Sequence, residues 1–316
     1  MKLKGKKVFI TGGTGFIGSH LIEKIIDDNE VVVFDNLSRN ALENTPIENH
    51  KNLKIVKGDV LDTASLDKSI DNADIVIHMA AIAGVGTVIS KPTTTLKINL
   101  IGSYNVLEAC RKKNINRYVS FSTSEVYGPN IYEADEGGMT TLGPIGKPRW
   151  MYAMSKLAAE FLADSYQREH GIIFTSIRPF NIYGPRQIGE GAIHAFVEKA
   201  VKNETITVHE PGSQIRSWCY VDDIVDAMEE VLVNKKTEGE VINIGNPQAT
   251  STTLQTAQTV IRLANSKSRI EFKELKYPEV NIRVPSIGKA KRILGFEPKV
   301  SFEEGIKRTI DWYKNQ

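Results

Sequence analysis

Short runs of hydrophobic residues alternate with amphipathic stretches through the first half of the chain. The short runs are rich in Val, Ile and aromatic residues, as strands are, whereas the longer stretches repeat hydrophobic residues at helical spacing. We expect strands at residues 7–11, 30–34, 53–56, 74–79, 118–122 and 172–178, and helices at 15–28, 93–113 and 150–170. Because strands and helices alternate, the pattern predicts an α/β fold with a parallel sheet covered by helices.

The pattern loosens after residue 178. Helices are expected at 192–202, 221–234 and 253–265, with irregular β-structure between them. We therefore expect a larger domain over residues 1–178 and a smaller α/β lobe over residues 179–316, with some of the later chain crossing back to the first domain. No internal repeat or long linker separates the two parts, so an extended interface between them is expected.

Composition limits the classes of function. With 41% hydrophobic and 25% charged residues, the sequence is typical of a globular protein. The net charge is +2 and the basic residues are scattered, which gives no sign of a nucleic-acid partner. The longest apolar run, residues 75–86, is too short to cross a bilayer, and residues 1–7 lack a signal-peptide pattern, so we expect a cytoplasmic protein without a membrane partner. Cys110, Cys219 and the six histidines follow no disulfide or metal-site pattern, and no metal is expected.

A glycine-rich turn, Thr11-Gly-Gly-Thr-Gly-Phe-Ile-Gly18, connects the first expected strand to the first helix. The missing side chains of Gly12, Gly15 and Gly18 permit a tight turn, let backbone N–H groups approach a pyrophosphate, and let the helix pack closely on the strand. The N-terminus of the helix favours the negative charge. The turn therefore predicts a dinucleotide site in a doubly wound, Rossmann-type sheet.

Asp35 ends the second expected strand, roughly twenty residues beyond the turn, where a carboxylate can accept hydrogen bonds from the adenosine ribose hydroxyls. A carboxylate there repels a 2′-phosphate, which favours NAD over NADP, although nearby Arg39 leaves NADP open. After the next strand, Gly58-Asp59-Val60 is either the edge of an adenine pocket or a simple turn.

Tyr152 and Lys156 lie four residues apart in an expected helix and so share one face. A nearby cation favours the phenolate, so Tyr152 can exchange a proton with a substrate hydroxyl beside a nicotinamide. Alternatively, the pair decorates a solvated face. The run Ser122-Thr-Ser-Glu-Val-Tyr-Gly128 follows directly on a strand, where this architecture binds ligands. Its hydroxyl groups either face a substrate or cap backbone donors.

Together these features resemble the extended short-chain dehydrogenase/reductase family, in its branch of NAD-dependent nucleotide-sugar epimerases, dehydratases and decarboxylases. The resemblance extends to the end of the chain, through Arg178–Arg186, Gly212–Asp223, Asn243–Asn246 and Arg283-Val-Pro285. It implies a catalytic core of Thr123, Tyr152 and Lys156, in which Thr123 binds the sugar O4 and Lys156 also holds the nicotinamide ribose.

The resemblance also implies the remaining site residues. NAD would be held by Gly12, Gly15, Phe16, Ile17, Gly18, Asp35, Asn36, Asp59, Val60, Ala80, Ala81, Asn99, Ser122, Tyr152 and Lys156. The nucleotide diphosphate of a UDP-sugar would be held by Asn181, Arg216 and Arg283, since guanidinium forks match phosphate oxygens. Relatives usually form dimers through a pair of helices, so a homodimer is expected.

Glu125 and its neighbour Ser124 decide which reaction is expected. Members of this branch begin by oxidising C4 of the sugar, and a base at C5 then leads to elimination of water across C5 and C6. Glu125 offers that base, so we expect a 4,6-dehydratase of a UDP-hexose, for example UDP-N-acetylglucosamine. Ser124 replaces the Asp that serves as acid in many hexose dehydratases, which puts the acid role in doubt.

Other functions remain open. Residues 142–150 resemble the segment before the catalytic tyrosine in bacterial UDP-glucuronate decarboxylases, where Lys147 or Arg149 either meets a substrate carboxylate or is a solvated loop charge. A 4-epimerase needs only to let the keto sugar rotate, and commonly carries a small or apolar residue at position 125. A non-catalytic NAD-binding module would lack the Tyr152 and Lys156 pair, which is present here.

Overall fold

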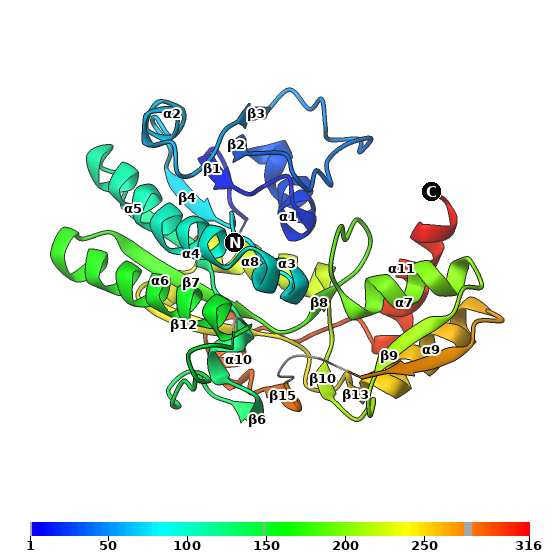
Figure 1. Ribbon diagram of the computed structural model, residues 1–316. Coiled ribbons are helices and arrows are strands. Elements are labelled where there is room, and N and C mark those ends of the chain that lie inside the picture. Colours follow the sequence, from blue (N-terminus) through cyan, green and yellow to red (C-terminus); the bar gives the residue numbers. More distant parts are fainter. Residues whose placement is uncertain (1, 148, 275–279) are drawn as a thin grey trace.

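The centre of the molecule is a seven-stranded sheet in the order β12-β7-β5-β4-β1-β2-β3 (Figure 1). The computed structural model describes residues 2–147, 149–274 and 280–316. All neighbouring strands of this sheet are parallel. Its strands are β1 (Lys7–Thr11), β2 (Glu30–Asp35), β3 (Leu53–Lys57), β4 (Ile75–His78), β5 (Arg117–Phe121), β7 (Ile173–Pro179) and β12 (Glu240–Ile244). The predicted α/β fold with a Rossmann-type parallel sheet is confirmed.

Two hydrophobic clusters lie on opposite faces of this sheet. Val8 and Ile10 of β1 pack with α1 (Phe16–Ile25) and α8 (Val221–Val233). Phe9, between them in sequence, points the other way and packs in a second cluster with α2 (Thr63–Ser69), α5 (Gly102–Lys112) and α6 (Arg149–His170). Because both faces are covered, the strands are continuous hydrophobic runs rather than alternating ones.

The helix expected at 93–113 is divided in the structure. It comprises α4 (Pro92–Leu96), a π-helical turn (Lys97–Ile101) and α5, and is preceded by the short α3 (Val85–Ser90). Pro92 accounts for the start, because its fixed φ and missing N–H suit the first helical turn. The π-helical turn contains Asn99, whose side chain binds both backbone groups of Ile82.

The remaining strands form smaller sheets. A four-stranded sheet has the order β13 (Thr250–Thr252), β10 (Ile215–Ser217), β15 (Ile282–Pro285) and β6 (Asn130–Ala134). Two strand pairs join β8 (Ile182–Tyr183) to β11 (Cys219–Tyr220) and β9 (Ile206–His209) to β14 (Ile270–Lys273). Besides α8, the α-helices after residue 178 in the described chain are α7 (Ala192–Val201), α9 (Thr253–Ala264), α10 (Gly288–Leu294) and α11 (Phe302–Lys314).

Two strands cross the position at which the two parts of the chain were expected to divide. Strand β12 lies after residue 178 but pairs with β7 in the large sheet. Strand β6 lies before residue 178 but pairs with β15 in the four-stranded sheet. Each part of the chain therefore supplies a strand to the sheet that the other part mainly builds.

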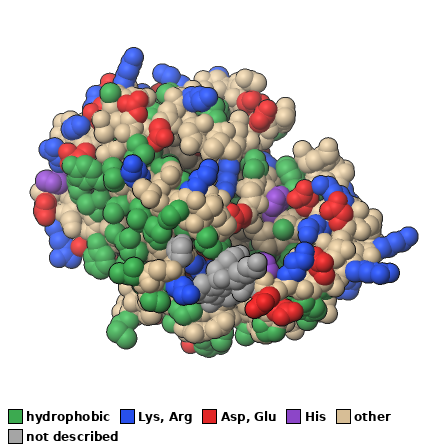
Figure 2. Space-filling model, in the orientation of Figure 1, with side chains coloured by type: hydrophobic (Ala, Val, Ile, Leu, Met, Phe, Trp, Pro, Cys, Tyr) green, Lys and Arg blue, Asp and Glu red, His purple; other side chains and the backbone are tan. Residues whose placement is uncertain are grey.

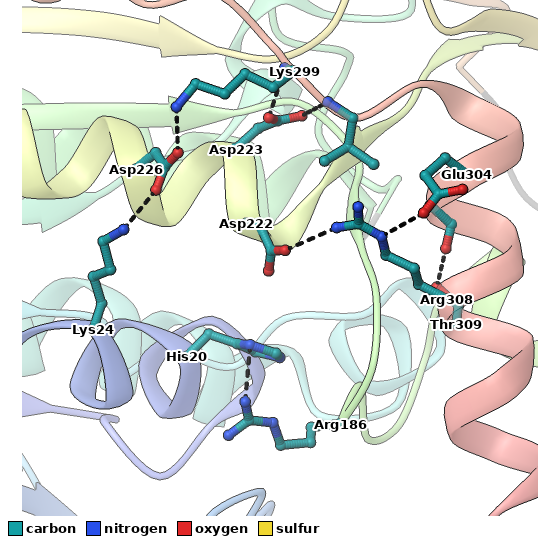
Figure 3. Close-up of polar contacts among 12 residues, drawn as sticks. His20, Lys24, Arg186, Asp222, Asp223, Asp226, Lys299, Glu304, Arg308 and Thr309 are labelled. Atoms are coloured by element: carbon teal, nitrogen blue, oxygen red, sulfur yellow. Dashed lines mark hydrogen bonds and ion pairs between the residues drawn. The ribbon is translucent and has the colours of Figure 1, made fainter.

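Charged side chains tie α8 and the C-terminal part of the chain to α1 (Figure 3). Asp226 accepts hydrogen bonds from Lys24 (2.9 Å) and Lys299 (2.7 Å), and Arg308 of α11 lies 3.4 Å from Asp222. These residues surround a cavity of about 1100 Å³. None of the candidate site residues lines this cavity.

Among the residues that the structure describes, no helix is long and apolar enough to cross a membrane. Nor do they contain a group of three or more His, Cys, Asp or Glu side chains placed to hold a metal ion. Cys110 and Cys219 are both buried as free thiols.

Candidate active site

The glycine-rich turn between β1 and α1 forms one wall of a cavity of about 400 Å³. Gly12 has φ +71° and donates its N–H to the carbonyl of Phe34 (3.0 Å). A Cβ at Gly12 would lie 2.5 Å from the backbone nitrogen of Ala80, and one at Gly18 would lie 2.5 Å from the carbonyl oxygen of Gly13. Side chains are therefore excluded where the turn, the end of β4 and the start of α1 meet.

The expected cofactor residues gather around this cavity, with one exception. Asn99 lies behind the wall, where it accepts a hydrogen bond from the N–H of Ile82 (2.8 Å) and donates to Ser155 (3.2 Å). Asn99 therefore shapes the cavity through Ile82, which does line it. The expected residues that line the cavity are Gly12, Gly15, Phe16, Ile17, Gly18, Asp35, Asn36, Asp59, Val60, Ala80, Ala81, Ser122, Tyr152 and Lys156.

The polar groups of this cavity fit a dinucleotide. The Asp35 carboxylate accepts from the N–H groups of Thr14 (3.1 Å) and Leu37 (2.8 Å), which leaves lone pairs for ribose hydroxyls. The Ser122 hydroxyl oxygen is buried with no hydrogen-bond partner among the described residues. A buried hydroxyl without a partner is costly, and a polar ligand in the cavity removes that cost.

A second cavity, of about 770 Å³, adjoins the first. The expected catalytic and substrate-binding residues line it, except Lys156, which lines the first. They are Thr123, Ser124, Glu125, Tyr152, Asn181, Arg216 and Arg283. Tyr152 and Asn181 line both cavities. The phenol of Tyr152 thus lies at the boundary where a cofactor in one cavity meets a substrate in the other.

Burial sets the protonation of the Tyr152 and Lys156 pair. Removal from water raises the pKa of Tyr152 to about 12, against the opposing effect of a hydrogen bond with Thr123. Burial also lowers the pKa of Lys156 to about 8, and its ammonium donates to the carbonyl of Phe121 at the end of β5 (2.7 Å). At neutral pH the phenol is therefore protonated and the ammonium charged.

Glu125 is held between two arginines. Its carboxylate lies 3.2 Å from Arg149 and accepts a short hydrogen bond from Arg283, which also donates to the carbonyl of Gly128 (2.9 Å). Burial alone raises the pKa of Glu125, but the charges of Arg283 and Arg149 outweigh it and lower the pKa to about 2. Arg149 is buried in the wall of the second cavity, whereas Lys147 is exposed.

The three residues expected to bind a diphosphate converge on the second cavity. Arg216 and Arg283 are register partners on the neighbouring parallel strands β10 and β15. Arg216 donates to its neighbour, the carbonyl of Ile215 (3.0 Å). Asn181 has a positive φ of 42° and donates to the carbonyl of Ser217 (2.9 Å), at the end of β10. The four-stranded sheet therefore brings these side chains together.

Several lining residues were missed from the sequence. The loop at 187–191 contributes Gln187 and Glu190 to both cavities. The second cavity is also lined by His209 of β9 and by Gln214 and Trp218, which flank β10. Loops and short strands carry little periodicity, and the glycines at 189 and 191 were the one local sign of a special backbone there.

Comparisons with known proteins identify the group to which this site belongs. UDP-glucuronic acid decarboxylase 3 of Arabidopsis thaliana is 37% identical over 306 residues, which cover 95% of this chain and 86% of the relative. UDP-N-acetyl-alpha-D-glucosaminuronate decarboxylase of Bacillus cytotoxicus is 35% identical, with 98% of each chain covered. The structure of UDP-glucuronic acid 4-epimerase from Bacillus cereus, in complex with UDP-glucuronic acid and NAD, matches with a TM-score of 0.90 at 28% identity and covers 98% of this chain and 99% of that one.

The family model described as the NAD dependent epimerase/dehydratase family matches residues 8–245. That span includes the glycine-rich turn, Asp35, Glu125, Tyr152 and Lys156. The relatives include nucleotide-sugar decarboxylases and a dTDP-D-glucose 4,6-dehydratase, and structural neighbours contain NAD. The expectation of an NAD-dependent enzyme is confirmed. The chain therefore belongs to the NAD-dependent epimerase/dehydratase family, as an enzyme of its nucleotide-sugar group with NAD as cofactor.

Proposed function

We propose that this enzyme is a UDP-uronic acid decarboxylase, which oxidises C4 of the sugar and then releases the C6 carboxylate as carbon dioxide. The contact of Glu125 with Arg149 and Arg283 carries the proposal. A carboxylate paired with two cations, with a pKa of about 2, is a weak base at neutral pH, whereas a dehydratase needs a base at C5. Both relatives described above are decarboxylases of uronic acid sugars, which supports the same choice.

Decarboxylation needs no base at C5. Once C4 is a ketone, the C6 carboxylate lies β to it, so the C5–C6 bond breaks, carbon dioxide leaves and the electron pair forms a C4–C5 enolate. A proton from the solvent then adds to C5 and completes the replacement of the carboxylate by hydrogen. NAD, when bound, supplies the oxidation and the later reduction at C4. Tyr152 exchanges the O4 proton, and as a phenol with a pKa of about 12 it donates a hydrogen bond to the enolate oxygen.

Two buried polar atoms in the second cavity suit a uronate. Nε of Arg283 and Oε2 of Glu125 are buried without hydrogen-bond partners among the described residues. The guanidinium N–H needs an acceptor, which a substrate carboxylate or phosphate supplies, and the carboxylate oxygen needs a donor, which a sugar hydroxyl supplies. Arg149 adds a second buried cation to this wall. A phosphate on Arg283 would be present in any UDP-sugar, so it is the additional buried cation of Arg149 that favours a substrate with an anionic C6 over a neutral hexose.

A 4-epimerase of the same uronate is the second candidate. It is favoured by the similarity to the epimerase structure that holds UDP-glucuronic acid and NAD. The two reactions share the substrate and the oxidation at C4. In the decarboxylase the keto acid then loses carbon dioxide, whereas in the epimerase it rotates within the site before C4 is reduced. The dehydratase hypothesis requires a neutral UDP-hexose instead.

A substrate panel tests the proposal. The enzyme is incubated with NAD and, separately, UDP-glucuronate, UDP-N-acetylglucosaminuronate, UDP-glucose and UDP-N-acetylglucosamine, and the products are weighed by mass spectrometry. Loss of carbon dioxide from a uronate supports the proposal. Loss of water from a hexose supports the dehydratase, and an unchanged mass with an altered NMR spectrum supports the epimerase. The Tyr152→Phe variant serves as the inactive control.

We also propose that the enzyme is a homodimer through α5 and α6. These helices pack against each other, and hydrophobic side chains gather over them in Figure 2. Three apolar side chains are exposed on this face: Ile101 at the end of the π-helical turn (47%), Tyr104 of α5 (47%) and Phe161 of α6 (66%). Clustered exposed apolar side chains mark interaction surfaces, and a helix pair presents the same face to a second copy across a two-fold axis.

A further inference from the structure

We propose that Glu190 is a positioning residue that clasps a loop across the boundary between the two cavities, and so retains NAD and the oxidised sugar during turnover. The loop comprises residues 187–191 and is named here the bridging loop. Glu190 is distant in sequence from the segment that it holds, which is the first turn of α3 (Val85–Ser90).

The contact is a carboxylate with three donors. Oε2 of Glu190 accepts from the N–H of Gly86 (2.8 Å), and Oε1 accepts from the N–H (2.9 Å) and the hydroxyl (2.8 Å) of Thr87. Partial burial raises the pKa of Glu190, but these hydrogen bonds and the charge of Arg39 outweigh it and lower the pKa. The carboxylate is therefore ionised at neutral pH, and its hydrogen bonds are charge-assisted.

Two glycines in the backbone around the contact leave room for the side chains of Glu190 and Arg39. A Cβ at Gly84, where φ is +103°, would lie 2.8 Å from Cδ of Glu190. A Cβ at Gly189, where φ is +93°, would lie 2.9 Å from Cζ of Arg39. Arg39 follows β2 and lines the first cavity. Three segments far apart in sequence thus meet at this contact, which is named here the clasp. They are the bridging loop, the segment containing Gly84 and the segment containing Arg39, and the first two approach through glycines.

The clasp lies across both cavities. Gln187, Ile188 and Glu190 of the bridging loop line the first cavity, and Gln187, Gly189, Glu190 and Gly191 line the second. On the other side of the contact, Ala83 lines both cavities and Gly84 lines the second. The contact therefore connects two segments that each line both cavities, at the place where cofactor and sugar would meet.

Retention matters for this chemistry, an argument that rests on the proposed function. The sugar is oxidised and later reduced at the same carbon, so cofactor and 4-keto sugar must stay together between the two steps. Early departure of either ends the cycle without product. Glu190 acts through the bridging loop and not on the reacting atoms, which makes it a positioning residue.

The first test follows cofactor dissociation without any substrate. Enzyme loaded with radiolabelled NAD is chased with a large excess of unlabelled NAD, and the label retained on a filter is measured over time. We expect Glu190→Ala to dissociate about tenfold faster or more, because charge-assisted hydrogen bonds are lost. Thr87→Val, which removes one donor of three, is expected to have a smaller effect in the same direction.

The matched control is Glu198→Gln on α7. It removes one negative charge from the helix that follows the bridging loop, where Glu198 pairs with exposed Lys202 and is not among the described residues that line either cavity. We expect its NAD dissociation to equal that of the wild type. Wild-type dissociation in both Glu190→Ala and Thr87→Val overturns the proposal. A melting temperature recorded for each variant separates loss of the clasp from loss of the fold.

The second test uses UDP-glucuronate and measures free 4-keto sugar relative to final product. We expect Glu190→Ala to raise this ratio about tenfold over the wild type, in line with faster loss of the partners. If NAD dissociates faster but this ratio is unchanged, Glu190 retains NAD and does not retain the oxidised sugar. If the wild type does not convert a uronate, the proposed function fails, and the NAD chase still decides whether Glu190 is a clasp.

Discussion

Arg283 donates a hydrogen bond to Glu125, 158 positions earlier in the chain, and both side chains are largely withdrawn from water. Burying two charges is costly, and their attraction repays the cost only while both are present. The pair joins β15 of the four-stranded sheet to the turn that follows β5 of the large sheet. Changes at either residue should therefore affect stability and catalysis together.

The first prediction concerns acid stability. The pKa of Glu125 in the folded protein lies below its unfolded value, so the carboxylate contributes stability that is present above about pH 4.5 and lost as the pH falls to about 2. We expect the wild type to lose more unfolding free energy over this window than Glu125→Gln, by up to the order of 3 kcal/mol. Urea unfolding at several pH values measures it. Parallel curves for the two proteins would falsify the ion pair's role.

The second prediction concerns the phenol. Tyr152→Phe removes one hydroxyl at the boundary of the two cavities. We expect kcat to fall by about 10²–10⁴-fold, the usual range for a lost general acid or base, while the affinity for NAD stays within about twofold. Turnover and calorimetric NAD titration check the two halves separately. Turnover close to that of the wild type would remove Tyr152 from the mechanism.

The third prediction concerns alkaline pH. Because burial lowers the pKa of Lys156 to about 8, its cation is present below that pH and lost above it. Lys156 lines the cavity expected to hold NAD, where its cation would hold the nicotinamide ribose, so we expect kcat/KM to decline above about pH 8. Lys156→Arg keeps a cation at all accessible pH values and should lack this decline, although its rate is lower throughout. An alkaline decline that persists in Lys156→Arg assigns it to another group.

The fourth prediction separates backbone strain from close approach. Gly12 and Gly295 have similar φ angles, +71° and +65°, but a Cβ at Gly12 meets Ala80 and one at Gly295 meets nothing within 4 Å. Alanine at either position costs about 1–2 kcal/mol for the left-handed backbone. We expect Gly12→Ala to destabilise the protein further and to abolish NAD binding, and Gly295→Ala to keep it. Thermal melts and NAD titrations compare the two, and equal effects would contradict the steric argument.

The fifth prediction concerns assembly. Phe161→Glu places a charge on the proposed dimer face of α5 and α6, and we expect the protein to sediment as a monomer. Phe272→Glu is the control, because Phe272 is also exposed (47%) but lies on β14, away from that face. Sedimentation velocity at several concentrations measures both. A dimer that persists in Phe161→Glu rules out this face.

Sequence rules anticipated the parts of the site that are built locally. Gly12 is needed for a turn, Asp35 ends a strand, and Tyr152 and Lys156 are one helical turn apart, so a few neighbouring residues determine each position. The structure brings these residues to the walls of adjoining cavities.

Long-range pairing was beyond these rules. Glu125 was identified as the decisive residue, but its ion pair with Arg283 depends on how β15 packs, and the pair turns a candidate base into an ionised, weakly basic group. Glu190 had no local signature, because its partners lie more than a hundred residues earlier. Strand β6 was missed because its residues are mostly exposed and lack a hydrophobic run.

The position of β12 at the edge of the large sheet has a consequence for synthesis on the ribosome. Strand β7 ends at Pro179 and its outer neighbour begins at Glu240, so sixty residues separate them. Because the ribosome adds about 5–20 residues per second, the backbone N–H and C=O groups on the outer edge of β7 stay unpaired for roughly 3–12 seconds before β12 is synthesised. During that interval the nascent chain presents an open, apolar strand edge of the kind that pairs with other chains. Nascent-chain chaperones that shield this edge should therefore raise the yield of native enzyme.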